Sequence, residues 1–205
     1  MISPSPSQAA RVEAATALVM RLCRAFDLAA SDESEAAHAR VLTPAIKYWV
    51  CKTAPALIYE SMECLGGNGY VEDSILPRLY REAPVNAIWE GSGNVMCLDV
   101  LRAIGREPEA ARTVLHHLVH GGNTREMAES ITATLLSADA ESHARDAVER
   151  LALLAAASAL AQCAPQDSTD LFVRTRLQMR RGSMFGSSAI DDKNAADILS
   201  RAVPS

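Results

Sequence analysis

Apolar residues recur every three or four positions over most of the chain, which is the spacing of an amphipathic helix. Sustained alternation of apolar and polar residues, the pattern of a half-buried strand, is not found, and β-branched and aromatic residues are sparse. We therefore predict an all-α fold. The first helical stretch begins after residue 7 and places one apolar stripe at Val12, Ala15, Val19, Leu22 and Phe26.

The second helical stretch runs from about residue 41 to residue 65, after N-cap residues in the SDES sequence at 31–34. Pro44 and Pro55 lie inside it and oppose an unbroken helix, so we expect a kink or a break there. The sequence GGNGY at 66–70 ends this stretch. Because Pro77 and Pro84 interrupt the residues that follow, we expect an irregular region up to residue 87.

Further helices are predicted from residue 92 onward, and together they indicate a helical bundle with extra C-terminal helices. The first of them begins at the N-cap Ser92 and ends at Gly105, and the second begins at Pro108 and ends at the glycines 121–122. A capping box at 123–126 predicts the start of a third helix. Apolar stripes predict two more over 141–163 and 169–181, and a short tail helix is expected near 195–202.

Composition narrows the class of protein further. A chain of 205 residues can hold one ordinary domain, or one domain plus an appendage. A formal net charge of −5 excludes a global basic field, so any nucleic-acid role would depend on a local patch. No signal peptide or membrane span is predicted, and five scattered cysteines indicate reduced, buried thiols. We expect a cytoplasmic protein.

The sequence ECLGGNGY at 63–70 is the first candidate for chemistry. Paired glycines let a ligand approach the backbone closely and leave amide groups free to bind a phosphate. The alternative is an ordinary glycine stop at the end of a helix, which is the preferred interpretation of these letters alone.

The second candidate is WEGSGN at 89–94. Ser92 begins a helix whose free N–H groups and dipole suit a phosphate or a carbonyl oxygen. If Trp89 shields Glu90 from water, this carboxylate would bind a proton more readily, as a general base requires. Alternatively, Glu90 complements the helix dipole while Trp89 fills the core. Both interpretations stay open.

Two weaker signals lie further along. His116 and His120 have the spacing of metal ligands, but no cysteine or carboxylate joins them, and we predict no metal site. Phosphates could meet the arginines of RTRLQMRR, although a solvated surface with local ion pairs is the preferred interpretation. These arginines are Arg174, Arg176, Arg180 and Arg181.

Taken together, ECLGGNGY, about a dozen residues, LPRLYREAPVNAIWEGSGN and a helix resemble the C-terminal domain of the acyl-CoA dehydrogenase family. The similarity is strongest to its AidB-type alkylation-response branch, extends from about residue 10 to residue 186, and weakens beyond residue 104. It implies a bundle portion at 1–107 and an additional C-terminal helical region at 108–205. Family members bind FAD and usually form tetramers.

The resemblance also implies a reaction. Members remove hydrogen from the α and β carbons of an acyl-CoA thioester: a carboxylate takes the α-proton, and the flavin accepts the β-hydride. In many members that carboxylate occupies the position of Glu90, whose backbone N–H polarises the thioester carbonyl. A contact of this oxyanion type is worth roughly 3 kcal/mol.

Contacts to FAD are implied at both motifs. The glycine pair contacts the adenosine diphosphate part, commonly from a neighbouring subunit, and the start of the following helix reaches the flavin nucleotide. Glu63 stands where the family usually has glutamine, and a serine and an asparagine replace the usual threonine and glutamine of the second motif. The implied cofactor-binding positions are Glu63, Gly66, Gly67, Gly91, Ser92 and Asn94.

Nothing in the chain corresponds to the family's N-terminal helical domain, its β-domain or the first helix of its bundle. We therefore expect a fragment, or the product of a split or truncated gene, with uncovered apolar stripes that need a homo-oligomer or a companion chain. Two hypotheses follow. The first is the C-terminal part of an FAD-dependent acyl-CoA dehydrogenase-like oxidoreductase, incomplete alone. The second is a non-catalytic oligomerisation or DNA-associated module, with Arg102 as a candidate DNA contact.

Overall fold

The computed structural model describes residues 6–178 and 192–202, and every regular element in them is a helix, which confirms the predicted all-α fold. The elements are α1 Pro6–Leu28, α2 Glu33–Cys64, α3 Gly67–Tyr70, α4 Leu76–Asn86, α5 Gly93–Arg106, α6 Pro108–His117, α7 Gly122–Leu135, α8 Ala140–Cys163, α9 Gln166–Phe172, the π-helical segment η1 Val173–Gln178, and α10 Asp192–Ala202.

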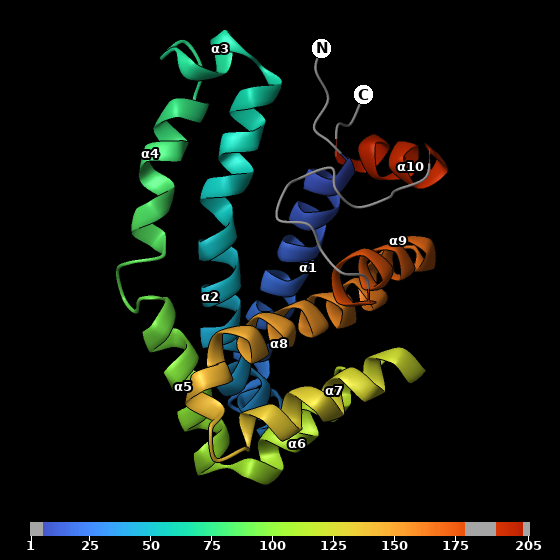
Figure 1. Ribbon diagram of the computed structural model, residues 1–205. Helices are drawn as coiled ribbons and strands as arrows, with labels where there is room; N and C mark the ends of the chain where they lie inside the picture. Colours follow the sequence, from blue (N-terminus) through green and yellow to red (C-terminus); the bar gives the residue numbers. More distant parts are fainter. Residues whose placement is uncertain (1–5, 179–191, 203–205) are drawn as a thin grey trace.

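The long helices are arranged around α2. Figure 1 shows α1 and α2 side by side, with α4 returning along α2 toward α5 and with α8 crossing the lower part of this layer. Helix α8 packs against α1, α2 and α5, and α7 packs on α8. Helices α7 and α8, which follow the bundle portion predicted at 1–107, thus cover one side of that portion.

Helix α2 is continuous through both of its prolines, so of the predicted kink or break, the break does not occur. Its start is fixed by Asp32, whose carboxylate accepts hydrogen bonds from two backbone N–H groups of the first turn. Each proline removes only one N–H donor from the helix, and burial of Leu42, Ala45 and Trp49 around Pro44 offsets that loss.

The region before residue 87 also differs from the prediction, because α4 forms there. Pro77 lies in the first turn of α4, where its missing N–H would have had no partner in any case. The helix ends predicted at glycines are displaced by a few residues as well. Helix α5 runs on to Arg106, α6 ends at His117, and α7 begins at Gly122 after Gly121 as the N-cap, with no side-chain cap.

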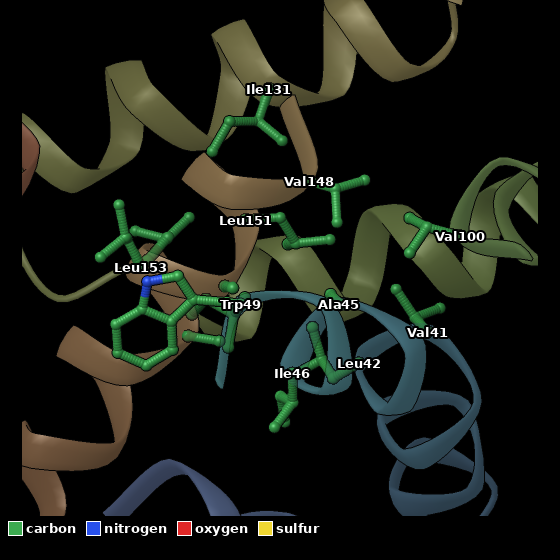
Figure 2. Packing of buried hydrophobic residues seen from close by; sticks show 14 of the residues in the cluster. Val41, Leu42, Ala45, Ile46, Trp49, Val100, Ile131, Val148, Leu151 and Leu153 are labelled. Carbon is green, nitrogen blue, oxygen red and sulfur yellow. The ribbon is translucent and has the colours of Figure 1, made fainter. Parts of the chain in front are cut away.

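The apolar core lies where α2, α5, α7 and α8 meet. Figure 2 shows side chains of α2, among them Leu42 and Trp49, converging with Val100 of α5 and with Val148 and Leu151 of α8. Helix α8 is buried on every side over residues 151–160, as an all-round apolar helix must be. The core continues across residue 107, and the division at that residue stays a prediction.

The apolar stripe predicted on α1 is divided: Ala15 and Leu22 are partly buried and pack against the core, whereas the other three residues face outward. Val12, Val19 and Phe26 are exposed, whereas Ala14 and Leu18 on another side of the helix are buried. A cavity of about 870 Å³ lies beside the exposed stripe, between α1, α2, α8 and α10.

The cysteines and the arginine run correct two further expectations. All five thiols are free, but only Cys97 is buried, and Cys23 and Cys163 are exposed. Arg176 is buried rather than solvated, because its guanidinium donates to the Ser7 hydroxyl of α1 at 2.5 Å. Arg180 and Arg181 lie outside the described residues. In the part of the chain that the structure describes, no helix is long and apolar enough to span a bilayer.

Candidate functional site

The turn between α4 and α5 holds Glu90 in an unusual backbone conformation. Its φ of 51° makes Glu90 the only non-glycine residue with a positive φ among residues 6–178 and 192–202. Gly91 follows with a φ of 120°. A non-glycine residue in this region costs roughly 1 kcal/mol or more, so surrounding contacts must hold it there.

Those contacts come from Lys47 on α2. Its ammonium group donates to the Trp89 carbonyl at 2.8 Å and to the Gly91 carbonyl at 2.6 Å. The two hydrogen bonds fix the peptide groups on both sides of Glu90. Sequence reasoning missed this residue, because a lone lysine on a helix 43 positions away carries no signal of such a contact.

Glycine is required beside Glu90 for packing as well as for conformation. A Cβ atom at Gly91 would lie 2.1 Å from the Met96 side chain. At Gly93 it would lie 2.9 Å from Lys52 Cε and 3.3 Å from Tyr48 Cε2. The start of α5 therefore approaches α2 closely, which places the turn next to Lys47.

The start of α5 presents two polar side chains to solvent. Ser92 is the N-cap by position, but its hydroxyl caps no N–H group, and the residue is exposed. The side-chain oxygen of Asn94 accepts a hydrogen bond from Arg145 of α8 at 3.2 Å, and this guanidinium lies 6.0 Å from the centre of the Tyr48 ring. Helix α8 thus contributes to the site a cation that sequence reasoning did not include.

The predicted shielding of Glu90 by Trp89 is wrong for this chain. Glu90 is exposed, Trp89 is 56% exposed, and Ile88 is 66% exposed. The contacts with Lys47 hold the backbone of the turn and leave the side chains free. The turn therefore presents a carboxylate and two large apolar side chains on one open surface.

The glycine pair lies at the far end of α2. Gly66 has a φ of 56°, and no atom lies within 4 Å of a Cβ built at Gly66 or Gly67. Glu63 is exposed nearby, and a hydrogen bond to it raises the pKa of Tyr59. At 1.5 Å per residue, about 26 Å of helix separates Lys47 from this turn. In one chain the two motifs are well apart.

Comparison with known proteins places this arrangement in a family. Residues 7–105, which contain both motifs, match the family described as acyl-CoA dehydrogenase, C-terminal domain. This part of the chain is similar to the C-terminal domain of acyl-CoA dehydrogenases.

Three relatives of known description share this domain. AidB of Escherichia coli (strain K12) is 57% identical over 99 residues, which are 48% of this chain and 18% of AidB. Acyl-CoA dehydrogenase family member 11 of Caenorhabditis elegans is 44% identical over 88 residues, 42% of this chain and 14% of that protein. The 3-(aryl)acrylate reductase of Clostridium sporogenes (strain ATCC 15579) is 31% identical over 85 residues. The matches thus span about a fifth or less of each relative.

Two solved structures resemble the fold. The apo form of Bd2924 superposes with a TM-score of 0.68 at 31% identity, over 76% of this chain and 32% of that chain. Caenorhabditis elegans ACDH-11, in complex with C11-CoA, superposes with a TM-score of 0.65 at 26% identity, over 80% of this chain and 33% of that chain. The structural likeness covers more of the chain than residues 7–105, so it extends into the helices after α5.

Beyond the acyl-CoA dehydrogenase motifs, α5 carries the candidate DNA contact. Arg102 is exposed, and with Arg106 it lies near Asp99. A hydrogen bond from Arg40 is the main cause of the lowered pKa of Asp99, and the two other arginines lower it further. Glu107 also lies near Arg40. Since two carboxylates face three guanidinium groups, this face of α5 has a small local excess of positive charge.

The two histidines with metal-ligand spacing, His116 and His120, do not lie on the same helix. His116 is exposed near the end of α6, whereas His120 lies beyond that end and contacts the Ser158 hydroxyl of α8 at 2.8 Å. Among the described residues, no cluster of three histidine, cysteine or carboxylate side chains could hold a metal ion.

Proposed function

We propose that this chain is part of an FAD-dependent acyl-CoA dehydrogenase-like oxidoreductase, which removes the α and β hydrogens of an acyl-CoA thioester. Glu90 is the proposed base. The observation that carries the proposal is the strained backbone of Glu90 within the family's motif. Strain of this kind persists where the surrounding structure enforces it, and it is concentrated at functional sites.

The substrate class follows from the relatives. The solved structure of ACDH-11 is a complex with C11-CoA. In our proposal, the Glu90 carboxylate of this chain accepts the α-proton of such a thioester, and the Glu90 N–H donates to its carbonyl oxygen. This donor stabilises the charge that develops as the proton leaves, by roughly 3 kcal/mol. FAD, when bound, supplies the acceptor for the β-hydride.

The open surface around Glu90 requires a cover. A carboxylate in water is too weak a base for an α-proton beside a thioester, so water must be excluded while the proton moves. Ile88 and Trp89 provide exposed apolar surface next to the carboxylate, against which an acyl group or another protein surface can pack. We infer that the complete site forms between this chain and such a surface.

The residues at the glycine pair fit FAD in shape, although not fully in charge. The open space at Gly66 and Gly67 lets a diphosphate reach the backbone, whereas the exposed Glu63 carboxylate opposes its negative charge. Ser92 and Asn94 offer an exposed hydroxyl and amide at the other motif, and Gly91 gives the backbone the positive φ of the turn. These six residues are the proposed cofactor contacts.

Separation of the two motifs favours a homo-oligomer. Because about 26 Å of helix lies between them, we propose that different copies of the chain contact the two ends of one cofactor. Exposed apolar side chains on and around α3 and α4 would be buried between the copies. They include Tyr70, Val71, Ile75, Val85 and Ile88.

The test of the proposed base is Glu90→Gln, which keeps the shape of the side chain and removes its basicity. Protein purified in the assembly that completes the site is assayed for flavin absorbance and for acyl-CoA oxidation with an artificial electron acceptor. We expect turnover to fall at least 100-fold while the flavin stays bound. Glu82→Gln on α4, a matched change of an exposed glutamate, should leave turnover unaltered. Unchanged turnover in Glu90→Gln would reject the assignment.

The local positive charge on α5 supports a second candidate, a non-catalytic DNA-associated module. In this alternative, Arg102 contacts a phosphate and the motifs serve as a scaffold. Colourless protein that retards DNA in a gel, and loses this retardation on Arg102→Ala, would favour it. The slope of the logarithm of the binding constant against the logarithm of the salt concentration should also become smaller by about 1, as expected for the loss of one phosphate contact. Arg112→Ala on α6 is the control, because Arg112 lies on another helix and pairs with Glu109.

A further inference from the structure

Lys47 is rigidly placed beneath the Glu90 turn. It is partly buried, and its neighbours on α2, Ile46 and Tyr48, are buried in the core, so the base of its side chain has little freedom. Its ammonium group donates to the carbonyls of Trp89 and Gly91, and no carboxylate is paired with it among the described residues. The Lys47 ammonium group therefore binds the backbone of the turn and not a side chain.

The two bonds determine where the next N–H groups point. In a planar trans peptide, the carbonyl of one residue and the N–H of the following residue point in opposite directions. Every peptide bond of the described chain is trans. Because the Trp89 carbonyl points toward Lys47, the Glu90 N–H points away from it. The Gly91 carbonyl directs the Ser92 N–H in the same manner.

Both N–H groups are available to a ligand. Within residues 6–178 and 192–202, neither the Glu90 N–H nor the Ser92 N–H donates a hydrogen bond. A cation on the carbonyl side polarises the peptide group and makes its N–H a stronger donor, because hydrogen bonds in a chain reinforce one another. Lys47 thus affects both the direction and the strength of these donors.

We propose that Lys47 is a positioning residue for the reaction: by holding the Trp89 and Gly91 carbonyls, it orients the Glu90 N–H toward the thioester oxygen of the substrate. This inference rests on the proposed function for its catalytic consequence, but its structural part does not. Lys47 does not contact the substrate. It acts through the Glu90 turn.

The structural part is tested on the full chain without flavin or substrate, by ¹H–¹⁵N NMR. In Lys47→Met, the amide signals of Glu90 and Ser92 should shift and broaden, while signals from the core of α8 stay in place. Lys47→Arg should keep both signals close to their original positions, because the guanidinium can donate to the same carbonyls. Unmoved Glu90 and Ser92 signals in Lys47→Met would overturn the proposal, whatever the protein catalyses.

Lys52→Met is the matched control. Lys52 is on the same helix, and its aliphatic carbon packs at Gly93, which methionine preserves. It forms no hydrogen bond to the turn among the described residues. This variant should leave the Glu90 and Ser92 signals unaltered. If it shifts them as strongly as Lys47→Met does, loss of any nearby charge explains the effect, and the assignment to Lys47 fails.

The catalytic part is tested by steady-state kinetics on flavin-loaded protein. Lys47→Met should lower kcat at least tenfold and change KM less than twofold, because the Glu90 N–H contact strengthens only in the transition state. Lys47→Arg should restore most of kcat. A normal kcat in Lys47→Met would overturn the catalytic role. Inactive wild-type protein with shifted NMR signals in Lys47→Met would instead reject the proposed function and leave the turn geometry standing.

Discussion

The two sides of α5 differ in how completely they are covered. On the α8 side, residues 151–160 are almost fully buried, and α1, α2, α5 and α7 pack against this helix. On the α4 side, Ile88 and Trp89 are more than half exposed next to Glu90. Helices from the C-terminal half of the chain complete the first side, whereas the described residues offer no cover for the second.

Because of this difference, we expect the α8 side to determine the stability of the fold and the Glu90 turn to determine its activity. Burial of apolar surface, at roughly 25 cal/mol per Å², stabilises the fold on the α8 side. The Glu90 turn contributes little burial and holds a strained residue with two hydrogen bonds from Lys47. We therefore expect mutations on the α8 side to change the free energy of unfolding, and mutations at the turn to change activity.

The largest expected effect is from a matched pair of isoleucine replacements. Ile131 is fully buried at the α7–α8 contact, and Ile88 is 66% exposed. Ile131→Ala should lower the free energy of unfolding by about 3 kcal/mol through the cavity it leaves, and Ile88→Ala by less than about 0.5 kcal/mol. Urea unfolding followed by circular dichroism measures both. Similar losses would mean that the turn is as closely packed as the core.

The next effect depends on pH and arises at the α1–α2 contact. Burial lowers the pKa of His38 to about 4, and the nearby Arg21 lowers it further. In the unfolded chain His38 binds its proton near its ordinary value of 6.5. Stability is therefore fully present above that value and is lost as the pH falls from there toward 4, by about 3 kcal/mol at most.

Urea unfolding between about pH 7 and pH 4 measures this loss, and His38→Gln should remove most of it. If His38→Gln and wild type lose stability equally over this range, other groups explain the acid sensitivity.

The smallest effects compare two glycines, one in each motif. Gly91→Ala places a methyl group against Met96 at a φ of 120°, and it should cost about 1–2 kcal/mol. Gly67→Ala enters open space at an ordinary φ, so its effect on unfolding should stay within about 0.5 kcal/mol. Thermal melting distinguishes them. Equal losses would show that the glycine pair at 66–67 is constrained by contacts of its own.

Sequence patterns located the elements better than their ends. Helix α5 begins directly after Ser92 and α6 begins at Pro108, as predicted. For α6 the reason is local, because proline geometry suits the first helical turn, whereas the Ser92 hydroxyl caps no N–H group. The break in α2 and the irregular region before residue 87 were wrong for a shared reason. Each relied on prolines, whose local cost is overridden by burial or avoided in a first helical turn.

The candidate site was only partly accessible to sequence reasoning. The spacing of GGNGY and WEGSGN placed Glu90 directly before a helix and identified the family, and both predictions are confirmed. The roles of the named site residues stay predictions. Of the two open interpretations of Trp89, one had it covering Glu90 and the other had it filling the core, and neither agrees with its 56% exposure. The direction of a side chain in a turn depends on contacts that adjacent letters do not encode.

By itself, the sequence determined the all-α class, most of the long helices and the place of both motifs, because helix periodicity, caps and glycine turns are local properties of a chain. Only the tertiary structure decided that α8 closes one side of α5, that Glu90 stands open on the other, and that Lys47 holds its turn. These features join residues more than 40 positions apart, and such contacts form only when packed helices bring distant segments together.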